Sequence, residues 1–255
     1  MGHIDVQIVV FLMGAGFSAA FVDSVVGGGG LISLPALLLT GLPPTAALGT
    51  NKLASLMGSL TSTLSFLRSG KIDVRIICWQ FPLAFFGSAA GVYVVQQIPA
   101  RFLTPLVVVM LGVITVYTFT RKDWGSASTY AGVKGRTAWL SGLAALGLGF
   151  YDGFFGPGTG TFLIFAFLLV GFDFVVAAGN AKALNFASNL AAVIAFGLFG
   201  SIHFLYALPM GAAMILGALA GSRLAIRKGA AYVRPLFIFM AAAMISKQMW
   251  DLLQR

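Results

Sequence analysis

The chain has 255 residues, of which 59% are hydrophobic and 9% are charged, and its mean hydropathy is +0.95. Soluble domains carry about a quarter charged residues and need a larger polar share to cover their surface. This composition excludes an ordinary soluble domain and predicts an all-α integral membrane protein that crosses the bilayer several times.

The net charge of +9 comes from 16 Lys and Arg residues against 7 Asp and Glu residues. In a soluble protein this surplus would suggest a nucleic-acid partner, but in a membrane protein basic residues collect in cytoplasmic loops. We therefore expect no nucleic-acid partner. The single cysteine, Cys78, excludes an internal disulfide and a multi-cysteine metal site, so we expect no metal and no cofactor.

Apolar runs separated by charges or turn residues predict ten helical segments. A bilayer core needs about 20 helical residues, so eight segments are long enough to span it. The segments 30–41 and 160–171 are too short, and because each follows a glycine cluster we predict broken or re-entrant half-helices there. The remaining segments are 6–26, 44–67, 74–96, 101–120, 137–155, 174–199, 204–226 and 231–250.

Basic residues predict how these segments are oriented. Eleven of the 16 lie in three loops, at 68–75, 121–136 and 223–234. Threading ten segments through the membrane puts all three loops on one side, which the positive-inside rule assigns to the cytoplasm, with both termini outside. Re-entrant short segments would leave the loops on that same side.

The two halves of the chain match when it is shifted by 130 residues. Of the 53 pairs formed by 20–72 and 150–202, 13 are identical, among them Lys52 with Lys182. Each half holds five segments, and an odd number turns the second half upside down in the membrane, as in many secondary transporters. We predict one membrane domain with a first repeat at 1–120, a cytoplasmic linker at 121–136 and a second repeat at 137–255.

A glycine cluster interrupts the first helix of each half: DSVVGGGG from Asp23 to Gly30 and DGFFGPGTG from Asp152 to Gly160. Each interior glycine costs about 1 kcal/mol of helix stability relative to Ala, and irregular backbone at membrane depth needs protein or a water-filled cavity around it. The helix that restarts points N–H groups and a positive dipole end into that space. We interpret the clusters as an anion site, with close helix packing as the alternative. The predicted site residues here are Gly28, Gly29, Gly30, Gly158, Thr159 and Gly160.

Two further motifs, GTNKLASLMGS at 49–59 and GNAKALNFASN at 179–189, each place a lysine deep in a helix. Lys52 lies about eight residues, ~12 Å, into its helix, and Lys182 lies at the same depth from the opposite side. A lysine near the midplane costs ~2.5–3.5 kcal/mol on insertion scales, so each should face the protein interior and find a partner. We expect neighbouring side chains to donate hydrogen bonds to an oxyanion: Asn51, Ser55, Asn180 and Asn185.

Asp23 and Asp152 are the acids available to these lysines, and two interpretations stay open. The lysines form a paired cationic site for an oxyanion, or the acids neutralise them in structural ion pairs; the acids are in addition candidate proton carriers. Both hold if an acid binds its lysine only while the anion site is free. The shift of 130 aligns Asp23 with Gly153, one residue away from Asp152, which argues against symmetric roles.

At these motifs the chain resembles the TauE/SafE family of membrane proteins, the sulfite exporter family. The resemblance covers essentially the whole chain, and SRLAIRKG at 222–229 is similar to a branch known as probable membrane transporters. It implies transport of sulfur-containing anions, such as sulfite, sulfonates or sulfoacetate, across the bacterial inner membrane. The matching residues are GFSAAFVDSVVGGGGLISLPAL at 16–37, TNK at 50–52 and GFYDGFFGPGTGTF at 149–162.

Together these features predict a secondary transporter of a small anion that works by alternating access of two inverted repeats, with no ATP-binding motif. An anion channel that uses the same lysines is the alternative. An enzyme is disfavoured because the sequence has no HExxH or GxSxG motif and only two distant histidines. The oligomeric state stays open, a homo-oligomer included.

Overall fold

The computed structural model describes residues 6–99, 101–102, 130, 132 and 136–229. The described part contains eight helices, and each corresponds to one of the ten segments predicted from the sequence. The other two predicted segments lie outside it: 231–250 entirely, and 101–120 except for its first two residues. The helices are α1 (Val6–Val26), α2 (Gly30–Leu38), α3 (Pro44–Arg68), α4 (Val74–Gln96), α6 (Arg136–Phe154), α7 (Thr159–Val170), α8 (Phe174–Leu198) and α9 (Phe204–Lys228).

Four of these helices, α1, α4, α8 and α9, are both long and apolar enough to cross a membrane. Helix α3 has 25 residues and is long enough, but it is less apolar because it carries the polar side chains of the Lys52 motif. The short helices have 9 residues in α2 and 12 in α7, or about 14 and 18 Å at 1.5 Å per residue. Neither reaches across a hydrocarbon core of ~30 Å.

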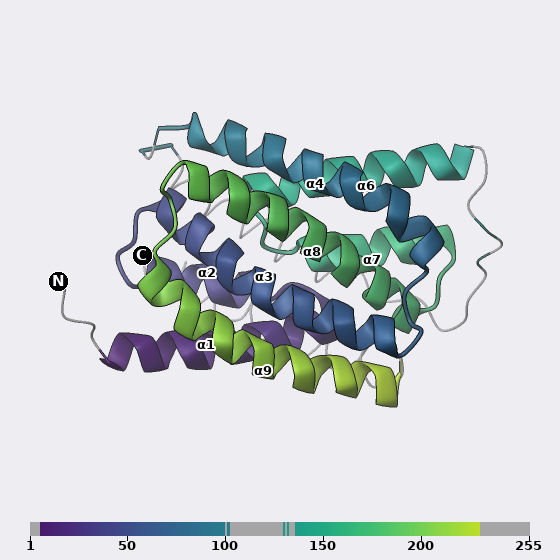
Figure 1. Cartoon of the computed structure of the whole chain (residues 1–255), viewed down its shortest axis with the longest axis horizontal. Coiled ribbons are helices and arrows are strands. Elements are labelled where there is room, and N and C mark those ends of the chain that lie inside the picture. Colours follow the sequence, from purple (N-terminus) through teal and green to yellow (C-terminus); the bar gives the residue numbers. More distant parts are fainter. Residues whose placement is uncertain (1–5, 100, 103–129, 131, 133–135, 230–255) are drawn as a thin grey trace, which may run out of the picture.

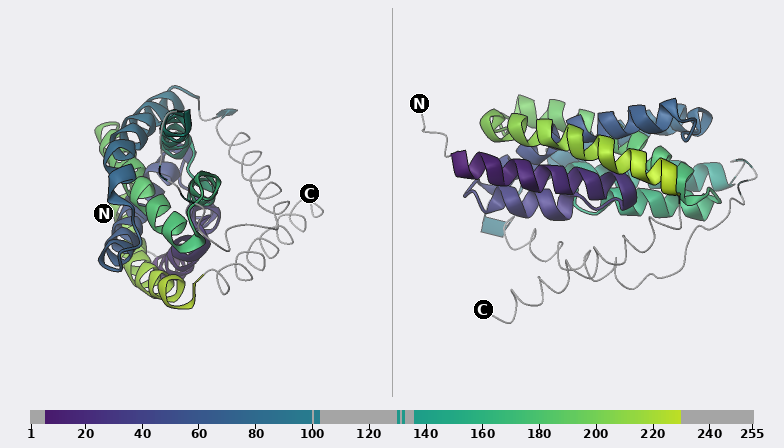
Figure 2. Two further views of the ribbon diagram at one scale, coloured as in Figure 1. Left: turned by 90° about the vertical axis from the view of Figure 1, so that its right-hand side faces the viewer. Right: turned by 90° about the horizontal axis from the view of Figure 1, so that it is seen from below.

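The chain reverses direction at each glycine cluster, so α1 with α2 and α6 with α7 form two helical hairpins (Figures 1 and 2). The reversals need backbone conformations that other residues rarely adopt: φ is 79° at Gly27, 83° at Gly28, 97° at Gly156 and 85° at Gly158. The short segments are therefore returning arms of hairpins.

The two hairpin tips contact each other. A Cβ added to Gly27 would lie 2.3 Å from the backbone nitrogen of Thr161, and one added to Gly30 would lie 2.9 Å from the Cα of Pro157. Thr161 also donates a hydrogen bond from Oγ1 to the carbonyl of Val26, at 3.3 Å. The glycines thus let two irregular segments from opposite halves meet backbone to backbone.

The long helices form a row in the order α1, α9, α3, α8, α4, α6, with α3 and α8 in the middle (Figure 1). The outer pairs pack closely because glycines face backbone carbonyls. A Cβ on Gly217 would lie 2.2 Å from the oxygen of Phe17, and one on Gly87 would lie 2.3 Å from that of Leu146. Close packing of this kind is typical of small residues spaced by four in membrane helices.

These contacts also show which residues of the two halves correspond to each other. Gly217 follows Gly87 by 130 residues, whereas Leu146 follows Phe17 by 129. The same combination recurs for Gly91 with Phe150 and Gly221 with Phe21. Helices α1 and α6 therefore correspond at a shift of 129, and the second tip contains one residue more than the first. At that shift Asp152 is the counterpart of Asp23, so the misalignment expected from the ungapped comparison disappears.

Candidate functional site

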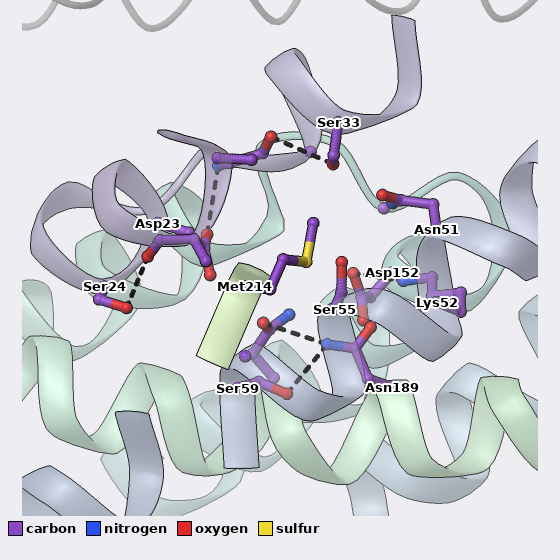
Figure 3. Close-up of a pocket in the computed structure, with 18 of the residues that line it drawn as sticks. Asp23, Ser24, Ser33, Asn51, Lys52, Ser55, Ser59, Asp152, Asn189 and Met214 are labelled. Carbon is purple, nitrogen blue, oxygen red and sulfur yellow. Dashed lines mark hydrogen bonds and ion pairs between the residues drawn. The ribbon is translucent and has the colours of Figure 1, made fainter. Parts of the chain in front are cut away.

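A small cavity lies where the two hairpin tips meet the central helices α3 and α8 (Figure 3). Its volume is about 30 Å³, measured as the space that the centre of a water molecule can reach, and one water needs about 10–15 Å³ by that measure. The cavity in this conformation therefore accommodates only a few water-sized molecules. Its polar lining is Asp23, Ser24, Ser33, Asn51, Lys52, Ser55, Ser59, Asp152, Asn185 and Asn189.

Lys182 and Asp23 form one ion pair at the cavity, with 2.6 Å between Nζ and Oδ2. The lysine side chain is fully buried, whereas the Asp23 side chain is 24% exposed and lines the cavity. The other carboxylate oxygen, Oδ1, accepts a hydrogen bond from the backbone N–H of Gly29 at 3.2 Å, at the N-terminus of α2. The carboxylate thus lies between an ammonium group and a positive helix end.

Lys52 and Asp152 form the second ion pair, with 2.8 Å between Nζ and Oδ1. Both side chains are nearly inaccessible, at 3% and 2% exposure. Asp152 also accepts a hydrogen bond at Oδ2 from the hydroxyl of Ser188, at 2.5 Å. Ser88 in turn donates from its hydroxyl to the carbonyl of Ser188, at 2.6 Å. This carboxylate is held by two partners and linked to α4 through α8.

Each lysine therefore binds the acid of the opposite half. Lys52 belongs to the first half and pairs with Asp152 of the second, while Lys182 belongs to the second and pairs with Asp23 of the first. In Figure 3, Asp23 lies on one side of the cavity and Lys52 with Asp152 on the other. Such partners are what buried lysines at membrane depth require.

The glycines of the second tip make room for both lysines. A Cβ on Gly156 would lie 2.8 Å from the Nζ of Lys52, and a Cβ on Gly160 would lie 3.2 Å from the Nζ of Lys182. The cluster therefore has two structural roles, because it lets the tips meet and it lets the ammonium groups approach the backbone.

Comparison with known proteins identifies the family of the chain. The model of the family described as sulfite exporter TauE/SafE matches residues 12–247. The chain belongs to the sulfite exporter TauE/SafE family. It is therefore a membrane transporter and not an enzyme, as the sequence predicts.

Relatives of the TauE/SafE chain have names of the same kind. It is 38% identical over 251 residues to a probable membrane transporter protein of Haemophilus influenzae, with 97% of each chain covered. It is 36% identical to the probable membrane transporter protein ORF9 of a Sinorhizobium species, with 98% and 96% covered. It is 35% identical to the probable membrane transporter protein YfcA of Escherichia coli K12, with 91% and 86% covered. No solved structure matches the chain.

Most of the predicted polar residues of this TauE/SafE transporter lie together at the cavity. Asn51 is 4% exposed, and its Oδ1 has no hydrogen-bond partner in the described part of the chain. Asn189 donates from Nδ2 to the Oδ1 of Asn185 at 3.3 Å and to the hydroxyl of Ser59 at 3.4 Å. The cavity is also lined by Ser55, Gly29, Gly30, Gly158 and Gly160.

Four predicted site residues do not line the cavity. Lys182 is not in the lining, but it pairs with Asp23, which is. Gly28 and Thr159 shape the hairpin tips, the first through its positive φ and the second through a hydrogen bond from Oγ1 to the carbonyl of Gly156. Asn180 lies elsewhere, because its Oδ1 accepts a hydrogen bond from the backbone N–H of Asp73 at 2.8 Å, at the start of α4. The structure thus gives Asn180 a contact between helices where the sequence suggested a substrate donor.

The sequence did not single out three residues that matter at the site. Ser188 holds Asp152, Ser33 lines the cavity from α2, and the Met214 side chain lies between Asp23 and Asp152 in Figure 3. Ser33 and Met214 lie in apolar runs, where nothing marks either as a site residue, although Ser33 falls within the stretch at 16–37 that resembles the family. The repeat offers a signal for Ser188, because at the shift of 130 it aligns with Gly58, so the second half has a hydroxyl where the first half has none. Among the described residues no group of three or more His, Cys, Asp or Glu side chains could hold a metal ion.

Proposed function

We propose that this protein is a secondary transporter that moves a small oxyanion of the sulfite or sulfonate class by alternating access. The oxyanion would bind Lys182 and Lys52, with Asn51, Ser55, Asn185 and the N–H groups of the hairpin tips as hydrogen-bond donors. The family description supports a sulfur oxyanion.

The observation that carries this proposal is the pair of ion pairs at the cavity, at 2.6 and 2.8 Å. Two lysines at membrane depth are costly and mark substrate pathways in membrane proteins. Their present partners are carboxylates, which are themselves oxyanions. A sulfonate or sulfite offers the same oxygen acceptors, so the ammonium groups suit such a substrate once an acid releases them.

The volume of the cavity favours a transporter over a channel. About 30 Å³ suits a few waters, so a sulfur atom with three oxygens enters only when the surrounding helices move. Saturable counterflow of a labelled anion is the behaviour expected of such a protein. Single-channel currents would instead support the channel.

The movement of helices that alternating access requires would come from two inverted repeats that move relative to each other. Equivalent contacts recur at shifts of 129 or 130 residues, each lysine binds the opposite half, and the six long helices are arranged symmetrically. We take 1–120 and 137–255 as the two repeats and 121–136 as the linker. The ends of α3 and α9 and the starts of α4 and α6 lie at one end of the bundle (Figure 1). These ends carry basic residues, so we assign that end to the cytoplasm and the protein to the bacterial inner membrane.

The test uses purified full-length protein. Sulfite, methanesulfonate, sulfoacetate and acetate are screened for an increase in melting temperature, because a ligand that binds the folded state stabilises it. Uptake of the labelled hit is then measured in proteoliposomes. We expect Lys182→Met and Lys52→Met to lose uptake, while Lys71→Met, in the 68–75 loop, retains it. Normal uptake by both Lys182→Met and Lys52→Met would show the site assignment to be wrong.

A further inference from the structure

The two carboxylates at the cavity are equivalent in the repeat but differ in freedom to move. Asp152 is 2% exposed and is held by Lys52 and by the hydroxyl of Ser188. Asp23 is 24% exposed, and its partners in the described structure are Lys182 and one backbone N–H, that of Gly29. Asp23 can therefore leave its lysine at smaller cost.

One position of the repeat differs between the halves in a way that fits this difference. Ser188, which anchors Asp152, corresponds at the shift of 130 to Gly58, which lines the cavity and has no hydroxyl. A Cβ at Gly58 would meet only ordinary neighbours, 3.4 Å from the Cβ of Met214 and 3.5 Å from that of Ala20. Space alone thus does not require glycine there, and its effect is that Asp23 has no counterpart of the hydroxyl that holds Asp152.

The Asp23 carboxylate occupies the position that suits a substrate oxyanion. It lies against the Lys182 ammonium, accepts from the N–H at the start of α2, and borders Gly160 of the facing tip. The buried Oδ1 of Asn51, which has no partner among the described residues, lines the same cavity. This amide oxygen is an acceptor, so it suits a donor such as water or a protonated group and not the oxyanion itself.

We propose that Asp23 is the coupling residue: it takes up one proton as a singly charged oxyanion replaces it on Lys182, so that anion and proton move together without net charge. This inference rests on the proposed function and adds the coupling ion, the charge of the substrate and the residue that links them. Asp152 stays ionised on Lys52 throughout.

The charge balance supports this step. Before binding, the Asp23 carboxylate and the Lys182 ammonium sum to zero. Afterwards the carboxyl holds a proton from the solvent on its O–H, the ammonium is unchanged, and the anion supplies the negative charge, so the sum is again zero. Without the proton, Asp23 and the anion would place two negative charges beside one lysine at low dielectric, where like charges repel strongly. The other charged groups facing Asp23 are Lys52 on α3 and Asp152 on α6, which neutralise each other.

Wild-type protein in proteoliposomes tests the coupling directly. Labelled methanesulfonate uptake is measured with a trapped pH dye under a pH gradient, and separately under a potassium diffusion potential. We expect one proton per anion, about tenfold accumulation per pH unit, and an initial rate that changes less than about twofold with 100 mV. Uptake without proton movement, or uptake driven by the potential, would overturn the inference.

Variants locate the coupling residue. Asp23→Asn keeps the shape but cannot exchange a proton, so we expect anion exchange across the membrane to persist while the response of accumulation to the pH gradient disappears. Gly58→Ser supplies the missing anchor and should slow uptake about tenfold, as expected for a hydrogen bond to a charged group. Gly58→Ala is the matched control, which adds the same Cβ without the hydroxyl, and it should transport faster than Gly58→Ser. Equal rates for these two variants would show that the hydroxyl does not explain the difference between the acids.

The outcomes separate this inference from the proposed function. Uptake that needs Lys182 but keeps its pH response in Asp23→Asn would overturn the role of Asp23 and leave an anion transporter. If Asp23→Asn does not yield folded protein, the proton-to-anion ratio of the wild-type protein still decides. No binding and no uptake of any anion tested would overturn the proposed function, and this inference with it.

Discussion

Thr50 and Asn180 make the same contact at opposite ends of the molecule. The Oγ1 of Thr50 accepts a hydrogen bond from the backbone N–H of His203 at 2.9 Å, and the Oδ1 of Asn180 accepts one from that of Asp73 at 2.8 Å. Asn180 follows Thr50 by 130 positions, and His203 follows Asp73 by the same 130. Each contact joins a central helix of one half to a turn of the other half.

These two contacts should control which end of the cavity opens. Asn180→Ala removes the acceptor at the end assigned to the cytoplasm, and Thr50→Val removes the one at the other end. Loss of one hydrogen bond is worth about 1 kcal/mol, or a fivefold shift between conformations. We expect Asn180→Ala to raise access to the cavity from the cytoplasm about fivefold and Thr50→Val to raise it from outside.

The measurement uses Ser55→Cys as a reporter in the cavity, with Cys78→Ser as background because Cys78 is exposed. Labelling by a charged maleimide is compared in right-side-out and inside-out vesicles, and the reporter without a second change is the control. Labelling that rises equally from both sides, or not at all, would show that the contacts do not control access.

Stability should distinguish the Lys52 pair from the Lys182 pair. Lys52→Met leaves Asp152 buried without its cation, and breaking a buried ion pair in this way costs about 3–5 kcal/mol. Lys182→Met leaves Asp23, which is 24% exposed and reaches the cavity. We expect a larger fall in melting temperature for Lys52→Met, measured in detergent, and a recovery in Lys52→Met with Asp152→Asn, which removes both charges. Equal losses for the two lysines would contradict the difference in burial.

Gly27 of the first hairpin tip and Gly41 of the turn between α2 and α3 offer a matched pair of substitutions. Gly27 and Gly41 have φ of 79° and 82°, so alanine strains the backbone equally at both, by about 1–2 kcal/mol. At Gly27 the new Cβ would also lie 2.3 Å from the backbone of Thr161, whereas at Gly41 nothing lies within 4 Å. We therefore expect Gly27→Ala to lose anion uptake, and Gly41→Ala to lose stability alone. Similar uptake by both would show that tip contact is dispensable.

The sequence predicts the lysines of the site better than it predicts their partners. A charge at membrane depth must face the interior, so Lys52 and Lys182 are identified by position and cost alone. Which acid each lysine binds depends on how the halves cross, and no local pattern encodes that crossing. The extra residue in the second tip likewise hid the correspondence of Asp23 with Asp152, because an ungapped comparison aligns the helices after the tips and misaligns those before them.

The sequence also predicts some helix ends well and others poorly. Proline, glycine and charge mark the ends of α3 and α4, so their predicted limits agree with the structure within one residue. Helix α2 ends at Leu38, three residues before the predicted limit, because Thr40 and Gly41 form a turn that apolar composition does not reveal. Asn180 seemed to be a substrate donor because it is two residues from Lys182 in the sequence, yet two residues along a helix turn a side chain by about 200°. That rotation directs it to Asp73 instead.

The orientation of the protein can be tested at two equivalent positions. Ser69 and Phe199 are the residues that follow α3 and α8, they are 130 positions apart, and both are exposed. Ser69 lies within the basic loop 68–75, whereas no Lys or Arg lies between α8 and α9. The positive-inside rule then places Ser69 in the cytoplasm and Phe199 outside. In intact cells carrying Cys78→Ser, a membrane-impermeant maleimide should label Phe199→Cys and not Ser69→Cys, and both should react after permeabilisation. Labelling of Ser69→Cys alone in intact cells would reverse the assignment, and labelling of both would rule out the inverted arrangement of the two halves.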